Sequence, residues 1–239
     1  MVFIPLSDEN PLRSISFQWV TISLIAANTI VFLLGSIQAE PAAIASFALI
    51  PSELFEVRIF GGAVPFANQS MQVPEGLTLI THQFLHADIF HLLGNMLFLW
   101  VFGDNVEDAM GHLKFLVFYL LCGIAGGLVH AALLPASLSP LIGASGAVAG
   151  VIAAYLMLHP RVLVWVLVFR FIPLRISAAW VLGIWVAWQL VMVALPQIGP
   201  TAWWAHVGGM VAGAILVLIM RRPGVVLFDR ALQATAAKP

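Results

Sequence analysis

The sequence predicts an all-α membrane protein, a six-helix transmembrane bundle with a long outer loop between its first two helices. Composition is the first reason: of the 239 residues, 62% are hydrophobic and only 9% are charged, whereas soluble domains carry about 25% charged residues. A water-solvated surface cannot be built from so few charges. The second reason is that apolar runs of roughly 18 or more residues, the length that a spanning helix needs, recur along most of the chain.

Six apolar runs are the candidate spans. The second is expected to continue to about residue 108, and neighbouring helices are expected to shield the short fourth run from full lipid contact. The segment 161–172 is also apolar, but Pro160 and Pro173 bracket it and it is too short to cross. Its valines predict a β-like connection at the membrane interface. The six runs are approximately 17–36, 89–103, 114–134, 145–159, 174–195 and 203–220.

The distribution of Lys and Arg predicts the orientation of the bundle. If the N-terminus is cytoplasmic, only Arg58 of the ten basic residues lies outside, which is a strong positive-inside bias. The segment 37–88 is then an outer loop, and segments 1–16 and 222–239 are cytoplasmic tails of a single membrane domain covering 1–239. The basic residues placed inside are Arg13, Lys114, Arg161, Arg170, Arg175, Arg221, Arg222, Arg230 and Lys238.

Several function classes are disfavoured by the residue content. The net charge of -1 argues against nucleic-acid binding. Cys122 is the only cysteine, which excludes an intramolecular disulfide and a cysteine-based metal site. His82 and His86 are spaced like a metal pair, but no glutamate follows His82 as an HExxH motif requires. We therefore predict no metal and no cofactor, and expect these histidines to tie the outer loop to the bundle by hydrogen bonds.

Polar side chains within the predicted spans are candidate functional groups, because they are costly in a bilayer. Spans two, four and six run in the same direction, so residues near their starts share one depth. His91, Asn95, Ser145 and His206 are therefore expected to converge near the outer face. The full set of polar candidates is His91, Asn95, Glu107, His130, Ser145, Gln189 and His206.

The chemistry of a serine hydrolase suits this set. Ser145 lies in a Gly-Ala-Ser-Gly turn that enters a helix, whose N-terminus favours a developing oxyanion. His206 can act as general base toward the serine and then as general acid toward the leaving amine. Since no Asp or Glu occurs between Asp108 and Asp229, a Ser-His dyad is a simpler prediction than a triad.

Two further patterns support that site. His91 and Asn95 are four residues apart on one helix face, and both could donate hydrogen bonds to an oxyanion. Small residues spaced by four, which allow close helix packing in lipid, occur in spans four and six. This spacing predicts that the two spans touch and bring the serine and the histidine within hydrogen-bond reach. The small residues are Gly146, Gly150, Gly209 and Gly213.

The combination of motifs resembles the rhomboid family of intramembrane serine proteases, over nearly the whole six-span core. The matching segments are HADIFHLLGN, GDNVEDAMG, GASG and AHVGGMVAG, which follow one another in this order. The resemblance implies that Ser145 is the nucleophile and His206 the base, with His91, Asn95 and Ser145 itself stabilising the oxyanion. It also implies a structural role near the site for His86, Gly143, Gly146, Gly209 and Gly213.

The implied activity is endoproteolysis in or next to transmembrane segments of client proteins. The implied partners are transmembrane protein substrates and the lipid bilayer, and the implied location is a bacterial inner membrane with both termini cytoplasmic and the site toward the outer face. A catalytically silent rhomboid-like binder of transmembrane clients is the alternative. A transporter or channel is disfavoured, because the inner half lacks matching polar groups and no inverted repeat is evident.

The chain departs from the family pattern at two places. Many relatives carry a Trp-Arg pair where this chain has Leu77 and Thr78, and many carry an aromatic residue where it has Ala149. The second change removes the usual ring against the catalytic histidine. At the inner side, the acids around Glu107 are interpreted as a solvated helix end, although the resemblance implies that Glu107 ties the inner loop together.

Overall fold

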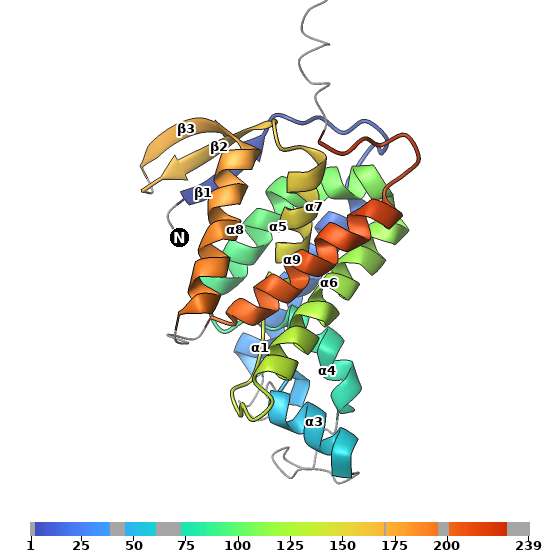
Figure 1. Cartoon of the computed structure of the whole chain (residues 1–239), viewed down its shortest axis with the longest axis vertical. Coiled ribbons are helices and arrows are strands. Elements are labelled where there is room, and N and C mark those ends of the chain that lie inside the picture. Colours follow the sequence, from blue (N-terminus) through green and yellow to red (C-terminus); the bar gives the residue numbers. More distant parts are fainter. Residues whose placement is uncertain (1–2, 39–45, 61–72, 170, 196–200, 229–239) are drawn as a thin grey trace, which may run out of the picture.

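The computed structural model describes residues 3–38, 46–60, 73–169, 171–195 and 201–228, and Figure 1 shows a helical bundle with a small sheet at one end. Its strands are β1 (Phe3–Asp8), β2 (Leu163–Val168) and β3 (Ile172–Ser177). A short 3-10 turn, η1 (His82–Phe84), follows the fourth helix. The helices are α1 (Trp19–Gln38), α3 (Pro51–Phe60), α4 (Glu75–Thr81), α5 (Ile89–Met110), α6 (His112–Leu133), α7 (Ser145–Leu158), α8 (Ala178–Ala194) and α9 (Trp203–Met220).

The long helices match the predicted apolar runs. Within the described residues, α5, α6 and α9 are long and apolar enough to cross a membrane, and three shorter apolar helices occur at 19–35, 145–158 and 178–194. Only Ser145, Leu156 and Met157 of α7 are not fully buried. Its neighbours therefore cover this fourteen-residue helix, so it need not match the bilayer thickness by itself.

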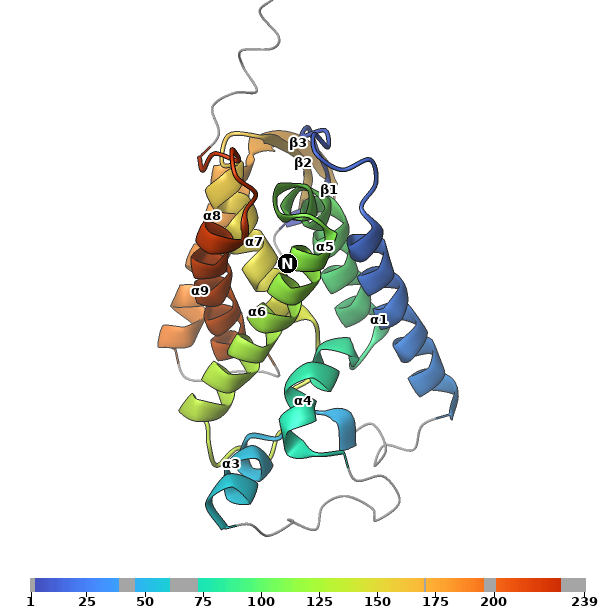
Figure 2. The same cartoon turned by 90° about the vertical axis from the view of Figure 1, so that its right-hand side faces the viewer.

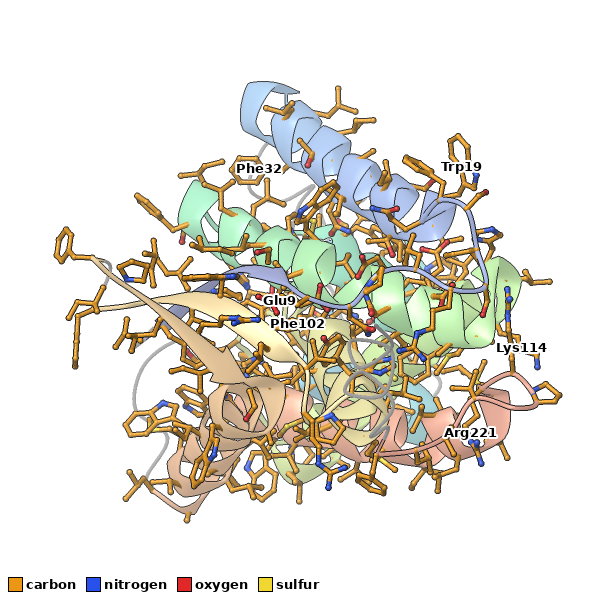
Figure 3. All side chains as sticks on the ribbon, turned by 90° about the horizontal axis from the view of Figure 1, so that it is seen from above. Glu9, Trp19, Phe32, Phe102, Lys114 and Arg221 are labelled. Atoms are coloured by element: carbon orange, nitrogen blue, oxygen red, sulfur yellow. The ribbon has the colours of Figure 1, made fainter. Side chains whose placement is uncertain are left out.

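The interior is aromatic and close-packed. Phe102 of α5 and Tyr155 of α7 are both buried, and their rings meet edge to face with centroids 4.9 Å apart. Figure 3 shows Phe102 near the middle of the bundle and Trp19 at its rim. Large apolar side chains such as Trp19 and Trp180 are exposed on the outside, as expected for a surface solvated by lipid.

The three strands form one antiparallel sheet in the order β1-β2-β3. The predicted fifth span, 174–195, therefore begins too early, because residues 172–177 pair with β2 and α8 starts only at Ala178. Pro173 disfavours a helix there, and pairing satisfies the backbone groups of the strand. The predicted β-like connection at 161–172 agrees with β2, whereas β1 lies in a segment predicted only as a tail.

A half-buried acid connects β1 to the bundle. The hydroxyl of Tyr155 donates a hydrogen bond to the carboxylate of Asp8, across the interface between β1 and α7. Burial raises the pKa of Asp8 to about 7, although the Tyr155 hydrogen bond acts in the opposite direction. The N-terminal segment is thus part of the packed structure at the sheet end.

The interpretation of Glu107 as a solvated helix end is wrong. The Glu107 side chain is 0% exposed and accepts hydrogen bonds from the backbone N–H groups of Val20 (3.0 Å) and Thr21 (2.8 Å). The Thr21 hydroxyl (2.7 Å) and the His112 ring (2.5 Å) complete its shell. Because the first N–H groups of a helix lack intrahelical partners, this carboxylate holds the start of α1 against α5.

The described part of the predicted outer loop lies at the opposite end of the molecule from the sheet, where Figure 2 shows α3 and α4. Leu49 forms an isolated bridge with Leu141, which connects this region to the loop before α7. Segments 39–45 and 61–72 of that predicted loop lie outside the described residues.

Candidate active site

The close approach of α7 and α9 organises the site. A Cβ atom added at Gly209 would overlap the backbone carbonyl of Gly146, and one added at Gly213 would overlap the carbonyl of Gly150. One added at Gly126 of α6 would lie 2.6 Å from the carbonyl oxygen of Ala205 and 3.4 Å from the Cα of Gly146. Three helix backbones therefore meet where α7 and α9 begin, as small residues permit in lipid.

Ser145 and His206 lie at this crossing. Ser145 is the first residue of α7 and precedes Gly146, while His206 is in the first turn of α9 and follows Ala205. Among the described residues, no hydrogen bond joins the Ser145 hydroxyl to the His206 ring. Such bonds are often long in a free enzyme and tighten when substrate binds.

The His206 ring has three partners. Its Nδ1 donates a hydrogen bond of 2.8 Å to Oε1 of Gln189 in α8. The Trp185 ring lies beside it, with centroids 6.2 Å apart and planes at 31°, and the Trp203 ring meets it edge to face at 5.9 Å. Trp185 and Gln189 are four residues apart, so they share one face of α8. Residues of two helices therefore hold the imidazole.

The position of Ala149 explains how Trp185 reaches the histidine. Ala149 is buried in a small cluster with Ala153 and Met210, and Trp185 packs against that cluster from α8. A small side chain at 149 leaves room for an aromatic ring from the neighbouring helix. The expected loss of a ring near His206 is therefore compensated from another element.

Gly143 faces His91 and Asn95 across the site. Gly143 has φ of 121°, which side-chain-bearing residues rarely adopt. A Cβ atom there would lie 2.7 Å from Cε1 and Nε2 of His91 and 3.9 Å from Nδ2 of Asn95. The His91 ring and the Asn95 amide thus approach the backbone two residues before Ser145. This is a suitable place for donors to an oxyanion.

Histidines of the outer loop support this side of the site. Asn95 donates from Nδ2 to Nε2 of His86 at 3.1 Å, and the His86 and His91 rings pack edge to face at 5.0 Å. Burial lowers the pKa of His86 to about 4, with a further contribution from His91, so His86 accepts this bond as a neutral ring. His82 donates from Nδ1 to the Thr78 carbonyl and accepts a backbone bond on its own carbonyl from Gly143.

Gln189 is the residue whose role the sequence did not predict. It was a polar candidate in a span, but nothing in its spacing connected it to His206, seventeen positions away. The only indication in the sequence was that an amide in a spanning helix needs a hydrogen-bond partner. Within the described residues, no group of three or more His, Cys, Asp or Glu side chains is placed to hold a metal ion.

These features define a class: a helical membrane protein with a polar cluster where α5, α7 and α9 begin. The chain belongs to the rhomboid family, since the Rhomboid domain model matches residues 74–223. That region includes every residue of the cluster described above, from Thr78 to Gly213. The expected family membership is therefore confirmed, and the chain is an integral membrane protein.

Curated relatives agree with this assignment. The chain is 31% identical over 150 residues to "RHOMBOID-like protein 6, mitochondrial" of Arabidopsis thaliana, covering 63% of this chain and 45% of the relative. It is 33% identical over 154 residues to "Rhomboid protein 1, mitochondrial" of Saccharomyces cerevisiae, covering 62% and 42%. A segment of 105 residues, 44% of this chain and 7% of the relative, is 33% identical to "Inactive rhomboid protein 1" of Drosophila melanogaster. The family thus contains members without activity, and this chain spans less than half of the first two relatives.

Proposed function

We propose that this chain is an intramembrane serine endopeptidase that hydrolyses peptide bonds in or next to transmembrane segments of client proteins. Ser145 is the nucleophile and His206 the general base in a dyad, within six spanning helices. The observation that carries the proposal is the contact between the starts of α7 and α9, where Gly146 and Gly209 meet backbone to backbone. With both termini cytoplasmic, the site opens toward the outer face.

The hydrogen bond to Gln189 determines which nitrogen of the base acts. Because Nδ1 of His206 is occupied by the Gln189 oxygen, Nε2 is the nitrogen left to accept the Ser145 proton. The serine Oγ then bonds to the substrate carbonyl carbon, and its proton moves to Nε2. Collapse of the tetrahedral intermediate breaks the C–N bond, and the same proton passes to the leaving amine. A water molecule repeats the sequence on the acyl-enzyme and releases the carboxylate product.

The negative oxygen of the intermediate is stabilised by His91, Asn95 and the backbone N–H of Ser145. The contact distances at Gly143 support this role, because the His91 ring and the Asn95 amide lie beside the loop that leads to the serine. His86 holds the Asn95 amide in place. Donors that are fixed before the charge develops need no reorganisation during the reaction.

A catalytically silent binder of transmembrane clients is the second candidate. The similarity to the inactive Drosophila relative favours it. The presence of both reactive side chains at one helix crossing favours the protease instead, because binding a client helix requires neither group.

Labelling of Ser145 distinguishes the two functions. Purified full-length protein in detergent is treated with a fluorophosphonate or an isocoumarin, and cleavage of single-span proteins is measured in liposomes. We expect the wild type to be labelled and active. Ser145→Ala should abolish labelling and lower kcat by at least about 10³-fold, as removal of a serine nucleophile does elsewhere. His206→Ala should act similarly.

A folded wild type that is neither labelled nor active would establish the silent binder. Cleavage that survives in Ser145→Ala would show a different nucleophile. Size-exclusion profiles of all three proteins serve as the folding control.

A further inference from the structure

We infer that Gln189 is a positioning residue that fixes the tautomer and orientation of His206. This inference rests on the proposed function, and it adds a third member to the site, where no carboxylate of the described residues hydrogen-bonds to the base. Gln189 is buried in α8 and its oxygen lies 2.8 Å from Nδ1 of His206. An amide oxygen only accepts hydrogen bonds, so the ring must carry its proton on Nδ1.

The consequence for catalysis follows from the two forms of a neutral imidazole. With the proton on Nδ1, Nε2 has a free lone pair and can accept the serine proton. With the proton on Nε2, that nitrogen can only donate, and the ring cannot serve as base toward Ser145. Gln189 therefore selects the active form, which an acidic residue does in other hydrolases.

Two aromatic rings also restrict the orientation of the His206 ring. Trp185, one turn before Gln189 on α8, lies beside the His206 ring, and Trp203 meets it edge to face. Rotation about the side-chain bonds of the imidazole would break the Gln189 hydrogen bond and the contacts with these rings. The amide thus acts together with the packing of Trp185, which lies against the cluster that contains Ala149.

Two substitutions separate an acceptor role from simple packing. Gln189→Met keeps the length of the side chain and removes the acceptor, whereas Gln189→Glu keeps an acceptor and removes the donor. We expect Gln189→Met to lower kcat and the fluorophosphonate labelling rate by roughly 10- to 100-fold, part of what a general base contributes, with KM unchanged. Gln189→Glu should restore most of the rate. Leu190→Ala, on the exposed side of the same helix, is the matched control and should behave as wild type.

A spectroscopic readout is independent of activity. Nitrogen-15 shifts of the His206 ring should show the proton on Nδ1 in the wild type and in Gln189→Glu, and a mixture of tautomers in Gln189→Met. A proton on Nε2 in the wild type would overturn the inference. Equal rates for Gln189→Met and an active wild type would also overturn it while leaving the protease intact. An unlabelled wild type would instead contradict the proposed function.

A separate observation, independent of the activity, concerns the β2–β3 hairpin. We propose that one face of this hairpin rests on the lipid of the leaflet at the sheet end of the bundle. Figure 1 shows the hairpin extending sideways past α8 at that end. Phe169 and Phe171, on either side of its turn, are 70% and 83% exposed. Aromatic side chains at such a position favour a membrane interface over water.

The two faces of β3 differ in chemistry. Ile172 and Leu174 lie opposite Val168 and Val166, on the face whose β2 residues pack toward the bundle, but both are exposed because the strand extends beyond the helices. Arg175 belongs to the other face and forms an ion pair with Glu9 of the N-terminal segment. Period-two alternation therefore places Ile172 and Leu174 on one face of β3 and Arg175 on the other.

The apolar face continues the lipid-facing surface of α8. Strand β3 ends at Ser177 and α8 begins at the next residue, and the outward side of that helix carries Trp180, Ile184 and Trp188, all exposed. A single apolar surface thus runs from the spanning helix onto the hairpin. Lipid therefore covers this continuous apolar surface, while the face of the hairpin that carries Arg175 points toward the headgroups and water.

Spin labels on adjacent residues test this placement. In a Cys122→Ala background, labels at Ile172→Cys and Leu174→Cys are compared with Pro173→Cys, the neighbour on the opposite face, in phosphatidylglycerol and phosphatidylethanolamine vesicles. Labels at 172 and 174 should be more accessible to oxygen than to a nickel chelate, and the label at 173 should show the reverse.

Two outcomes would overturn the lipid contact. Labels at 172 and 174 that meet the chelate as readily as the label at 173 would place the face in water. Immobilised labels that neither reagent reaches would show that protein, such as a second copy of the chain, covers it.

Discussion

Gly209→Ala should destabilise the bundle by about 3 kcal/mol or more, at the upper end of the cost of overpacking a core, and should abolish labelling of Ser145. The added methyl group would overlap the carbonyl oxygen of Gly146 and lie 2.8 Å from its carbonyl carbon. Both are backbone atoms, which cannot turn aside as a flexible side chain can. The starts of α7 and α9 must therefore separate, and Ser145 and His206 separate with them.

Gly183→Ala is the matched control, because a Cβ atom at Gly183 of α8 has no heavy atom within 4 Å. Alanine there should leave stability unchanged or raise it by up to about 1 kcal/mol through helix propensity. Unfolding in mixed micelles with increasing dodecyl sulfate measures both variants. A Gly209→Ala protein as stable and as readily labelled as Gly183→Ala would contradict the observed helix crossing.

Glu107→Ala should lower the free energy of unfolding by about 3–5 kcal/mol, the range for removing one partner from a buried charged network. The substitution leaves the N–H groups of Val20 and Thr21 at the start of α1 without an acceptor, and Thr21 is fully buried. Orphaned backbone donors are among the most expensive defects in a fold. We expect α1 to detach from α5 and become sensitive to added protease, while α7 and α9 stay packed.

Two companion substitutions define the Glu107 effect. Glu107→Gln keeps one oxygen acceptor and should lose less stability than the alanine variant. Glu9→Ala removes an exposed carboxylate whose ion pair with Arg175 lies at the surface, where such pairs contribute little. Limited proteolysis with mass spectrometry locates the first cleavage. If Glu107→Ala resists protease as well as Glu9→Ala does, the carboxylate does not hold α1.

The sequence predicted most of the helices well, because the hydropathy of a spanning segment reflects one dominant physical requirement, the pairing of backbone groups in lipid. Every backbone group in lipid must be paired within its own helix, so spans appear as long apolar runs. This signal located α1, α5, α6, α7 and α9 to within a few residues. It failed at residues 172–177, because an apolar strand can have the same composition as an apolar helix, and only its pairing with β2 distinguishes them.

The burial of an acidic residue also could not be predicted from the local sequence. The nearby acids Asp104 and Asp108 favour a solvated helix end at Glu107, yet the structure buries Glu107 completely. Burial of a carboxylate depends on donors from elsewhere in the chain, here the start of α1, nearly ninety positions earlier. No local pattern contains that information.

The sequence by itself determined the family, the membrane class and the candidate pair Ser145 and His206, since motif order and spacing are local properties of a chain. Only the tertiary structure decided what surrounds the pair. Gln189 and Trp185 reach the His206 ring from α8, and Trp185 packs against the cluster that contains the small side chain of Ala149. Their alignment depends on how three helices pack, and a helix's rotation against its neighbours is fixed by contacts across the bundle rather than along the sequence.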